Sequence, residues 1–125
     1  MLGDRDAIAT VGVKDVAAAR KFYEEKLGLK PLPSQEKDVL SYKAGSSTLL
    51  VYQSRYAGTN QATAVTWDVE DVDGTVRALK GKGVAFEHYD LPGTTREGDV
   101  HVAGKTRVAW FKDPDGNIHS LVTES

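Results

Sequence analysis

An internal repeat is the feature that most constrains how this chain can fold. Val13-Lys14-Asp15-Val16 recurs as Val69-Glu70-Asp71-Val72, and each copy begins a helical pattern that ends in glycine and an apolar residue. The chain has 125 residues, and a domain usually takes about 100 to 200. The repeat therefore predicts one domain over residues 1–125, made of two similar modules at roughly 1–56 and 62–125.

Each module is expected to contain one helix. Asp15 and Asp71 are of the type that caps helix N-termini, and apolar residues follow each of them at helical spacing. Gly28 and Gly83 can supply the left-handed conformation that ends a helix. The spacing therefore predicts helices between Asp15 and Gly28 and between Asp71 and Gly83.

Strands are expected on both sides of each helix. β-prone runs bounded by turn residues are residues 7–13, 30–36, 39–44 and 48–53 in the first module, and 64–69, 84–89, 106–111 and 118–123 in the second. Each module thus has the order βαβββ. Residues 55–63 and 90–105 are expected to be loops, and the length of the second suggests a functional one.

Composition excludes several classes of protein. With 40% hydrophobic and 27% charged residues the chain should fold as an ordinary globular protein. A formal charge of −2 without a same-sign block disfavours nucleic acid and membrane partners. No signal peptide or long apolar stretch is visible, so a cytoplasmic location is expected. The absence of cysteine excludes disulfides, thiolate metal sites and cysteine nucleophiles.

Two motifs carry a resemblance to a known family. They are the Lys-Phe-Tyr-Glu-Glu-Lys-Leu-Gly-Leu segment at 21–29 and Phe111-Lys112-Asp113-Pro114-Asp115-Gly116-Asn117. With the repeat, they make the chain resemble the vicinal oxygen chelate superfamily, which includes glyoxalase I, extradiol dioxygenases, fosfomycin resistance enzymes and bleomycin-binding proteins. The resemblance implies an α+β fold in which two βαβββ modules form a cupped mixed sheet, and it implies a homodimer.

The resemblance also identifies four positions where the enzymes of this superfamily hold a divalent ion with His, Gln or Glu. Carried over strand by strand, these positions are Ile8, Leu50, Ala64 and Ser120. Aliphatic side chains have no lone pair to offer a cation, and a lone serine hydroxyl is a poor ligand. We therefore expect neither a metal nor another cofactor at this site.

Turn chemistry predicts which residues of the last strand face the cup. If Asp113 to Gly116 form a type I turn with Gly116 left-handed, Trp110 lies opposite Ser120 and both face the cup. Phe111 and His119 then point to the helix side or to water. A slip of one residue would instead turn His119 into the cup.

Alternation along the strands predicts a largely apolar cup lining. The predicted ligand-binding residues are Thr10, Leu50, Tyr52, Ala64, Thr66, Asp68, Trp110 and Ser120, with Ile8 and Val122 on the same face. This lining suits an organic ligand with a flat or apolar surface. Asp68 could pair with a ligand cation or be an exposed carboxylate at a strand end, and Tyr52 and Trp110 could bind ligand or fill the core. Trp67 is assigned to the core.

Other chemically active residue types are interpreted as structural. His88, His101 and His119 could form a noncanonical metal site or supply a general base, but isolated surface histidines are the favoured interpretation. Asp113 and Asp115 occur in a turn that favours aspartate for backbone reasons. No catalytic residue is predicted.

The leading hypothesis is a metal-independent small-molecule-binding protein, similar to the bleomycin resistance proteins that act by sequestering a drug. Its ligand would be a small organic molecule, aromatic or glycopeptide, and its role antibiotic resistance. Residues 90–105 could close over the cleft as a lid. One alternative is a metal-dependent lyase, isomerase or dioxygenase with a displaced site. Another is a structural partner that binds no ligand.

Overall fold

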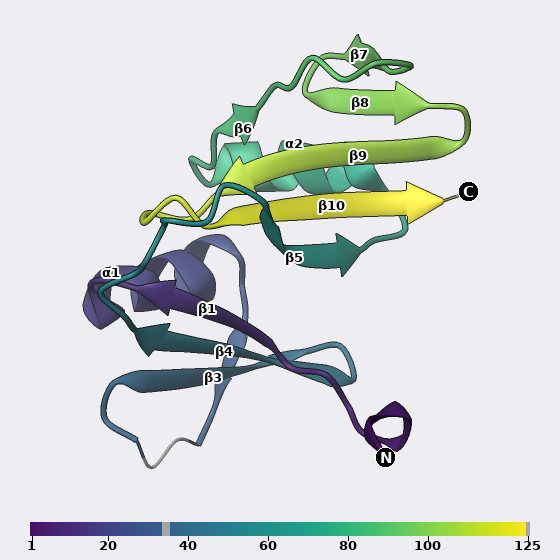
Figure 1. The fold of residues 1–125 in the computed structure, drawn as a ribbon. Helices are drawn as coiled ribbons and strands as arrows, with labels where there is room; N and C mark the ends of the chain where they lie inside the picture. Colours follow the sequence, from purple (N-terminus) through teal and green to yellow (C-terminus); the bar gives the residue numbers. More distant parts are fainter. Residues whose placement is uncertain (34–35, 125) are drawn as a thin grey trace.

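The first module forms a mixed sheet with the strand order β1-β4-β3-β2 (Figure 1). The computed structural model describes residues 1–33 and 36–124. Strands β1 and β4 are parallel, whereas β4 with β3 and β3 with β2 are antiparallel. The strands are β1 (Ala9–Val13), β2 (Lys30–Leu32), β3 (Val39–Ala44) and β4 (Ser47–Gln53), after a short 3-10 helix η1 (Leu2–Asp4).

The second module repeats this arrangement and extends it. Strands β5 and β10 are parallel, β10 and β9 are antiparallel, and the order continues through β8 to β7, while β6 also pairs with β9. The strands are β5 (Thr63–Asp68), β6 (Phe86–Glu87), β7 (Thr95–Glu97), β8 (Val100–Ala103), β9 (Thr106–Lys112) and β10 (Ile118–Glu124). The structure thus confirms an α+β fold of two βαβββ units, with the two additional strands β7 and β8 inserted into the second unit.

Both predicted helices begin at their aspartate caps. Helix α1 (Val16–Arg20) continues as a π-helix, η2 (Lys21–Lys26), and Asp15 accepts hydrogen bonds from the first backbone N–H groups of α1. Helix α2 (Val72–Gly81) begins after Asp71, which accepts from the N–H of Gly74. Gly28 and Gly83 follow the helices with φ of 73° and 90°, a region that favours glycine. The predicted caps and stops are therefore confirmed.

The prediction of a loop at 90–105 is wrong, because most of this segment forms the β7–β8 hairpin. Of the predicted strand 84–89 only Phe86–Glu87 pairs, and it covers one end of β9. At the other end of β9, the backbone N–H and C=O groups would lack partners if β6 were the only neighbour. Strand β8 pairs with these groups. In the first module the predicted strand 30–36 is limited to β2, and residues 34 and 35 lie outside the described residues.

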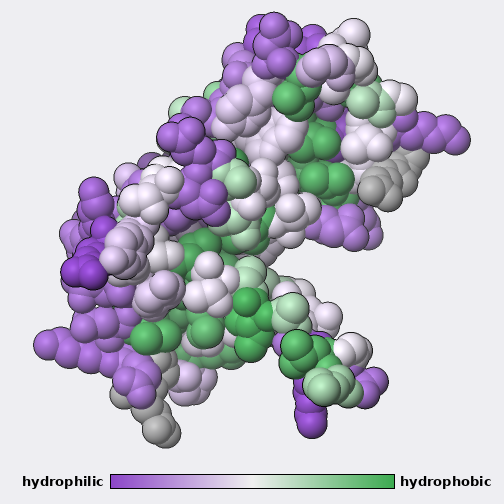
Figure 2. Space-filling view, viewed as in Figure 1, coloured by the Kyte–Doolittle hydropathy of each residue, from purple (hydrophilic) through white to green (hydrophobic). Residues whose placement is uncertain are grey.

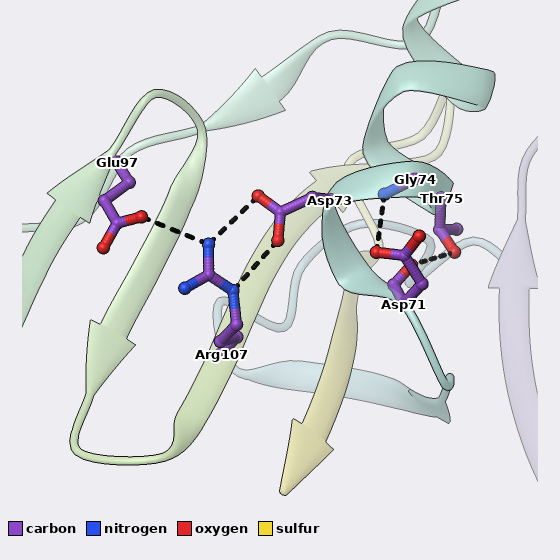
Figure 3. A network of polar contacts seen from close by, with 6 residues as sticks. All are labelled: Asp71, Asp73, Gly74, Thr75, Glu97 and Arg107. Atoms are coloured by element: carbon purple, nitrogen blue, oxygen red, sulfur yellow. Dashed lines mark hydrogen bonds and ion pairs between the residues drawn. The ribbon is translucent and has the colours of Figure 1, made fainter. Parts of the chain in front are cut away.

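Ion pairs fasten this hairpin to the rest of the second module. Figure 3 shows the Arg107 guanidinium donating through Nε and Nη2 to both carboxylate oxygens of Asp73, at 2.9 and 3.0 Å. The same Nη2 donates to Glu97 on β7 at 3.3 Å. At the hairpin turn, Asp99 accepts from Lys80 Nζ and pairs with His88 Nε2, both at 2.7 Å. Hydrogen bonds from Lys80 and His88 hold the pKa of the Asp99 carboxyl below its usual range.

The buried side chains form one cluster that draws on both modules. Val13, Tyr23 and Leu49 from the first module belong to the same cluster as Phe111 and Leu121 from the second. The π-helix of the first module reaches the second sheet directly, because the Tyr23 hydroxyl donates to Asp113 at 2.7 Å. The helical faces of both sheets are thus covered by a shared core.

None of the helices in the described part of the chain has both the length and the apolar character needed to cross a membrane.

Candidate functional site

The face of the sheets opposite the helices carries the predicted cup residues. In Figure 1 strands β9 and β10 lie in front of α2, and Figure 2 shows hydrophobic side chains gathered on this viewed face over both modules. In the first sheet Leu49 and Val51 are buried toward the helices, whereas Leu50 is half-buried and Tyr52 is 40% exposed. Because neighbouring strand residues alternate in burial, Leu50 and Tyr52 belong to the open face.

The register of the last two strands agrees with the turn argument. The Asp113 N–H donates to the Asn117 carbonyl, and Gly116 has φ of 94°. Ser120 lies opposite Trp110 on β9, and Phe111 lies opposite His119. His119 therefore points to the helix side, and the register in which it would face the cup does not occur.

The structure brings the predicted ligand-binding residues together in two groups rather than one. On the first sheet Thr10 is paired with Leu50, Tyr52 follows on β4, and Ile8 lies just before β1. On the second sheet the Ser120 hydroxyl donates to Thr66 Oγ1 at 3.0 Å. Strand alternation and register place six of the expected residues on the open face of this sheet, namely Ala64, Thr66, Asp68, Trp110, Ser120 and Val122. The two groups meet where β1 lies beside β5.

A cleft of about 520 Å³ lies at this junction, between β1, the β3–β4 turn and β5. Thr66 and Asp68 line it, together with Ala9, Thr48 and Trp67. Its volume is in the range of small-molecule sites, about 300 to 1,000 Å³. Among the predicted binding residues only Thr66 and Asp68 belong to this cleft. The cleft is not lined by Leu50, Tyr52, Trp110 or Ser120.

The residues at the four family metal positions do not fit a divalent ion. Ile8, Leu50 and Ala64 have no donor atom, and the Ser120 hydroxyl is engaged with Thr66. Within residues 1–33 and 36–124, no group of three or more His, Asp or Glu side chains is placed to hold a metal. No chemical step through a metal can therefore be derived for this site.

The interpretation of all three histidines as surface residues is wrong for two of them. His119 is 0% exposed, accepts from Trp67 Nε1 at Nδ1, and contacts the Tyr23 hydroxyl through Nε2, each at 3.0 Å. Burial lowers the pKa of His119 to about 4, against a smaller opposing effect of Asp113. His101 is 2% exposed, whereas His88 is exposed. Trp67 packs against the core as predicted.

His101 and Tyr89 lie against Trp110, although neither was among the predicted ligand-binding residues. His101 on β8 pairs with Val108 on β9, so it lies on the same face as Trp110 two residues further along. The rings of His101 and Tyr89 meet Trp110 edge to face, with centroid distances of 4.8 and 5.1 Å. The available signal was the alternating run Val100–Ala103 between Gly98 and Gly104, which is typical of a short hairpin strand.

Comparison with known proteins establishes the family. Residues 6–120 match the model of the Glyoxalase/Bleomycin resistance protein/Dioxygenase superfamily. The chain belongs to this superfamily, whose fold is the vicinal oxygen chelate fold. No curated protein matches the sequence.

Several solved structures share the fold over nearly the whole chain. TnmS3, an antibiotic binding protein from Streptomyces sp. CB03234, has 23% identity and a TM-score of 0.70, with 97% of this chain and 96% of TnmS3 covered. FosX, a fosfomycin resistance protein from Listeria monocytogenes, has 15% identity and a TM-score of 0.72, with 97% and 93% covered. A glyoxalase family protein from Enterococcus faecalis has 20% identity and a TM-score of 0.73, with 98% and 99% covered. At these identities the likeness concerns the fold alone.

Proposed function

We propose that this protein binds a small organic molecule on the open face of its two sheets, without a metal, and acts by sequestration. The observation that carries this proposal is the chemistry at the four positions where the family's enzymes hold a cation. Three of the four side chains there are aliphatic, Ile8, Leu50 and Ala64. An apolar ligand surface is favoured by such a lining, whereas an ion is not.

Aromatic side chains on the same face support an aromatic or glycopeptide ligand. Trp110 is half-buried on the second sheet and Tyr52 is 40% exposed on the first. Rings of this kind bury large areas and stack on flat ligands, and hydroxyl groups such as that of Thr66 can orient a polar substituent. The fold likeness to TnmS3, an antibiotic binding protein, supports an antibiotic as the ligand and resistance as the role.

We further propose that a second copy of the chain covers part of this face, with the ligand held between the copies. The open face carries exposed apolar side chains at Ile8 and Tyr52, 48% and 40% exposed. Burial of such a face by a symmetric partner would complete a cleft that each sheet forms only in part. Sedimentation analysis should then give twice the mass of one chain, and a monomer at all concentrations would contradict this arrangement.

Fluorescence titration tests ligand binding, since Trp67 and Trp110 are the two tryptophans of the chain. A panel of aromatic compounds and bleomycin should include one that quenches the fluorescence saturably. In Trp67→Phe only Trp110 emits, and the quenching should persist. In Trp110→Phe only Trp67 emits, and because Trp67 lines the cleft beside β5, weaker quenching is expected there for a ligand held against Trp110. No saturable quenching with any compound would contradict the proposal.

Metal analysis tests the other half of the proposal. Protein purified without chelator should contain far less than one zinc, nickel, iron or manganese ion per chain. A stoichiometric ion, lost together with an enzymatic activity in His101→Ala or His119→Ala, would instead establish an enzyme with a displaced metal site.

A further inference from the structure

Two buried polar atoms lie beside Trp110 on the open face. The Tyr89 backbone N–H donates to His101 Nε2 at 2.9 Å. His101 Nδ1 and the Tyr89 hydroxyl are both buried and find no hydrogen-bond partner within residues 1–33 and 36–124. Burying a polar group without a partner destabilises a protein, and a bound ligand that supplied the partners would remove this cost.

The hydrogen bond from Tyr89 determines the chemistry that His101 offers. A ring nitrogen that accepts a hydrogen bond carries no proton, so Nε2 is unprotonated. In a neutral imidazole the proton then lies on Nδ1, which becomes a donor. The missing partner of His101 is therefore an acceptor atom, such as an oxygen.

The surroundings of His101 add a positive charge. Arg96 on β7 pairs with His101 across the hairpin, so both side chains lie on the same face of the sheet. A pocket of about 280 Å³ opens here, lined by His88, Tyr89, Asp90, Thr94, Arg96 and His101. The Asp90 carboxylate is the one negative group among these six residues. His88 is paired with Asp99, which is itself paired with Lys80.

We propose that this pocket binds the carboxylate of a small aromatic acid whose ring lies against Trp110. The His101 Nδ1–H and the Arg96 guanidinium donate to the carboxylate oxygens, and the Tyr89 hydroxyl supplies a further donor, whereas the Thr94 hydroxyl already donates to the Leu91 carbonyl at 2.7 Å. The inference rests on the proposed function, because it names the class of ligand that the open face takes. It also assigns a role to the β7–β8 hairpin, which supplies both donors.

Two probes separate the pocket from the aromatic surface. Acetate carries the carboxylate without a ring, and its titration should shift the imidazole nitrogen signals of His101 saturably in NMR spectra. Calorimetry should show 2-naphthoate binding about tenfold or more tightly than the neutral 2-naphthamide, since hydrogen bonds to a charged group are stronger than those to a neutral group.

Variants assign the preference to particular residues. His101→Phe keeps a ring against Trp110 but lacks the N–H, and Arg96→Gln lacks the charge. Each should reduce 2-naphthoate binding about tenfold and leave 2-naphthamide binding unchanged. Arg77→Gln removes the same charge from an exposed position on α2 and should change neither. Arg96 is exposed, so its variant tests the pocket even if His101→Phe folds poorly.

The outcomes distinguish this inference from the proposed function. If both naphthyl probes bind equally and acetate does not shift the NMR signals of His101, the open face binds ligands but the proposed carboxylate pocket is refuted. If acetate shifts His101 while neither naphthyl compound binds, the anion site stands and aromatic binding fails. If Arg77→Gln and Arg96→Gln weaken 2-naphthoate binding equally, the effect comes from the net charge of the protein, and the proposed pocket is refuted.

Discussion

Trp67 and His119 are joined by a hydrogen bond of 3.0 Å from the indole N–H to imidazole Nδ1. Since Nδ1 accepts, the proton of the neutral ring lies on Nε2 and is donated to the Tyr23 oxygen 3.0 Å away. The Tyr23 hydroxyl donates in turn to Asp113 at 2.7 Å. Every polar atom of this buried series is satisfied only while His119 stays neutral.

The neutral state of His119 predicts a pH-dependent stability. Its pKa is about 4 in the folded protein and about 6.5 in an unfolded chain. Between these values the unfolded state binds the extra proton, so the free energy of unfolding falls as pH is lowered. The loss attributable to His119 should reach about 3 kcal/mol across this window. Urea denaturation from pH 7.5 down to 4.5 measures it.

The control for this prediction is His119→Gln, which retains an acceptor and a donor but does not titrate. Its stability should depend less on pH than that of the original protein between pH 6.5 and 4.5. The remaining dependence belongs to carboxylates, which both proteins share. Identical slopes would show that protonation of His119 does not control stability.

Tyr23→Phe should destabilise the protein by about 1 to 3 kcal/mol, because it leaves Asp113 and His119 with one partner fewer in the core. Tyr42→Phe is the matched control. The Tyr42 hydroxyl donates to Glu24 at 2.9 Å, and the Glu24 side chain is 25% exposed. Water can replace that bond, so we expect a cost near 1 kcal/mol. Chemical denaturation of both variants gives the comparison, and equal costs would contradict it.

Gly58→Ala should destabilise the protein by about 2 to 5 kcal/mol, from a left-handed backbone and from overpacking. Gly58 has φ of 70°, and an added Cβ would collide with the carbonyl oxygen of Asp115 in the β9–β10 turn. Gly104 has φ of 61° but open space around it. Gly104→Ala should therefore cost only about 1 to 2 kcal/mol. Thermal and urea unfolding test whether the two differ.

Asp99→Asn should loosen the β7–β8 hairpin. The substitution removes the charge that holds Lys80 and His88 to the hairpin turn. Amide hydrogen exchange should become faster across residues 88–103 and remain unchanged in β10. Asp6→Asn, at an exposed position before β1, removes an equal charge and should leave the hairpin unaffected. Unchanged exchange in Asp99→Asn would show that the ion pairs of Asp99 do not stabilise the hairpin.

Much of the fold could be predicted because its signals are local. The aspartate caps, the glycine stops and the Asp113 to Gly116 turn depend on neighbouring residues, and the turn alone determined that Trp110 pairs with Ser120. Alternation then predicted which side chains leave the core. These rules need no knowledge of distant contacts.

The hairpin and its histidine could not be predicted in the same way. Strands β7 and β8 are three and four residues long, and they are positioned by the pairing of β8 with β9 and by the ion pair of Arg107 with Glu97. The burial of His101 depends on Tyr89, which covers it from a separate segment. The chemistry of His119 likewise depends on Tyr23, ninety-six positions away in the chain. Such long-range relationships have no local sequence signature.

The hydrogen bond from Tyr23 to Asp113 also makes the two repeated units depend on one another. Tyr23 belongs to the first unit and Asp113 to the second. Each side chain is the hydrogen-bond partner of the other in the apolar interior, and either would lack that partner if its own unit were alone. Fragments of the present chain, cut in the connection around Gly58, should accordingly recombine into a complex rather than persist as separate folded pieces.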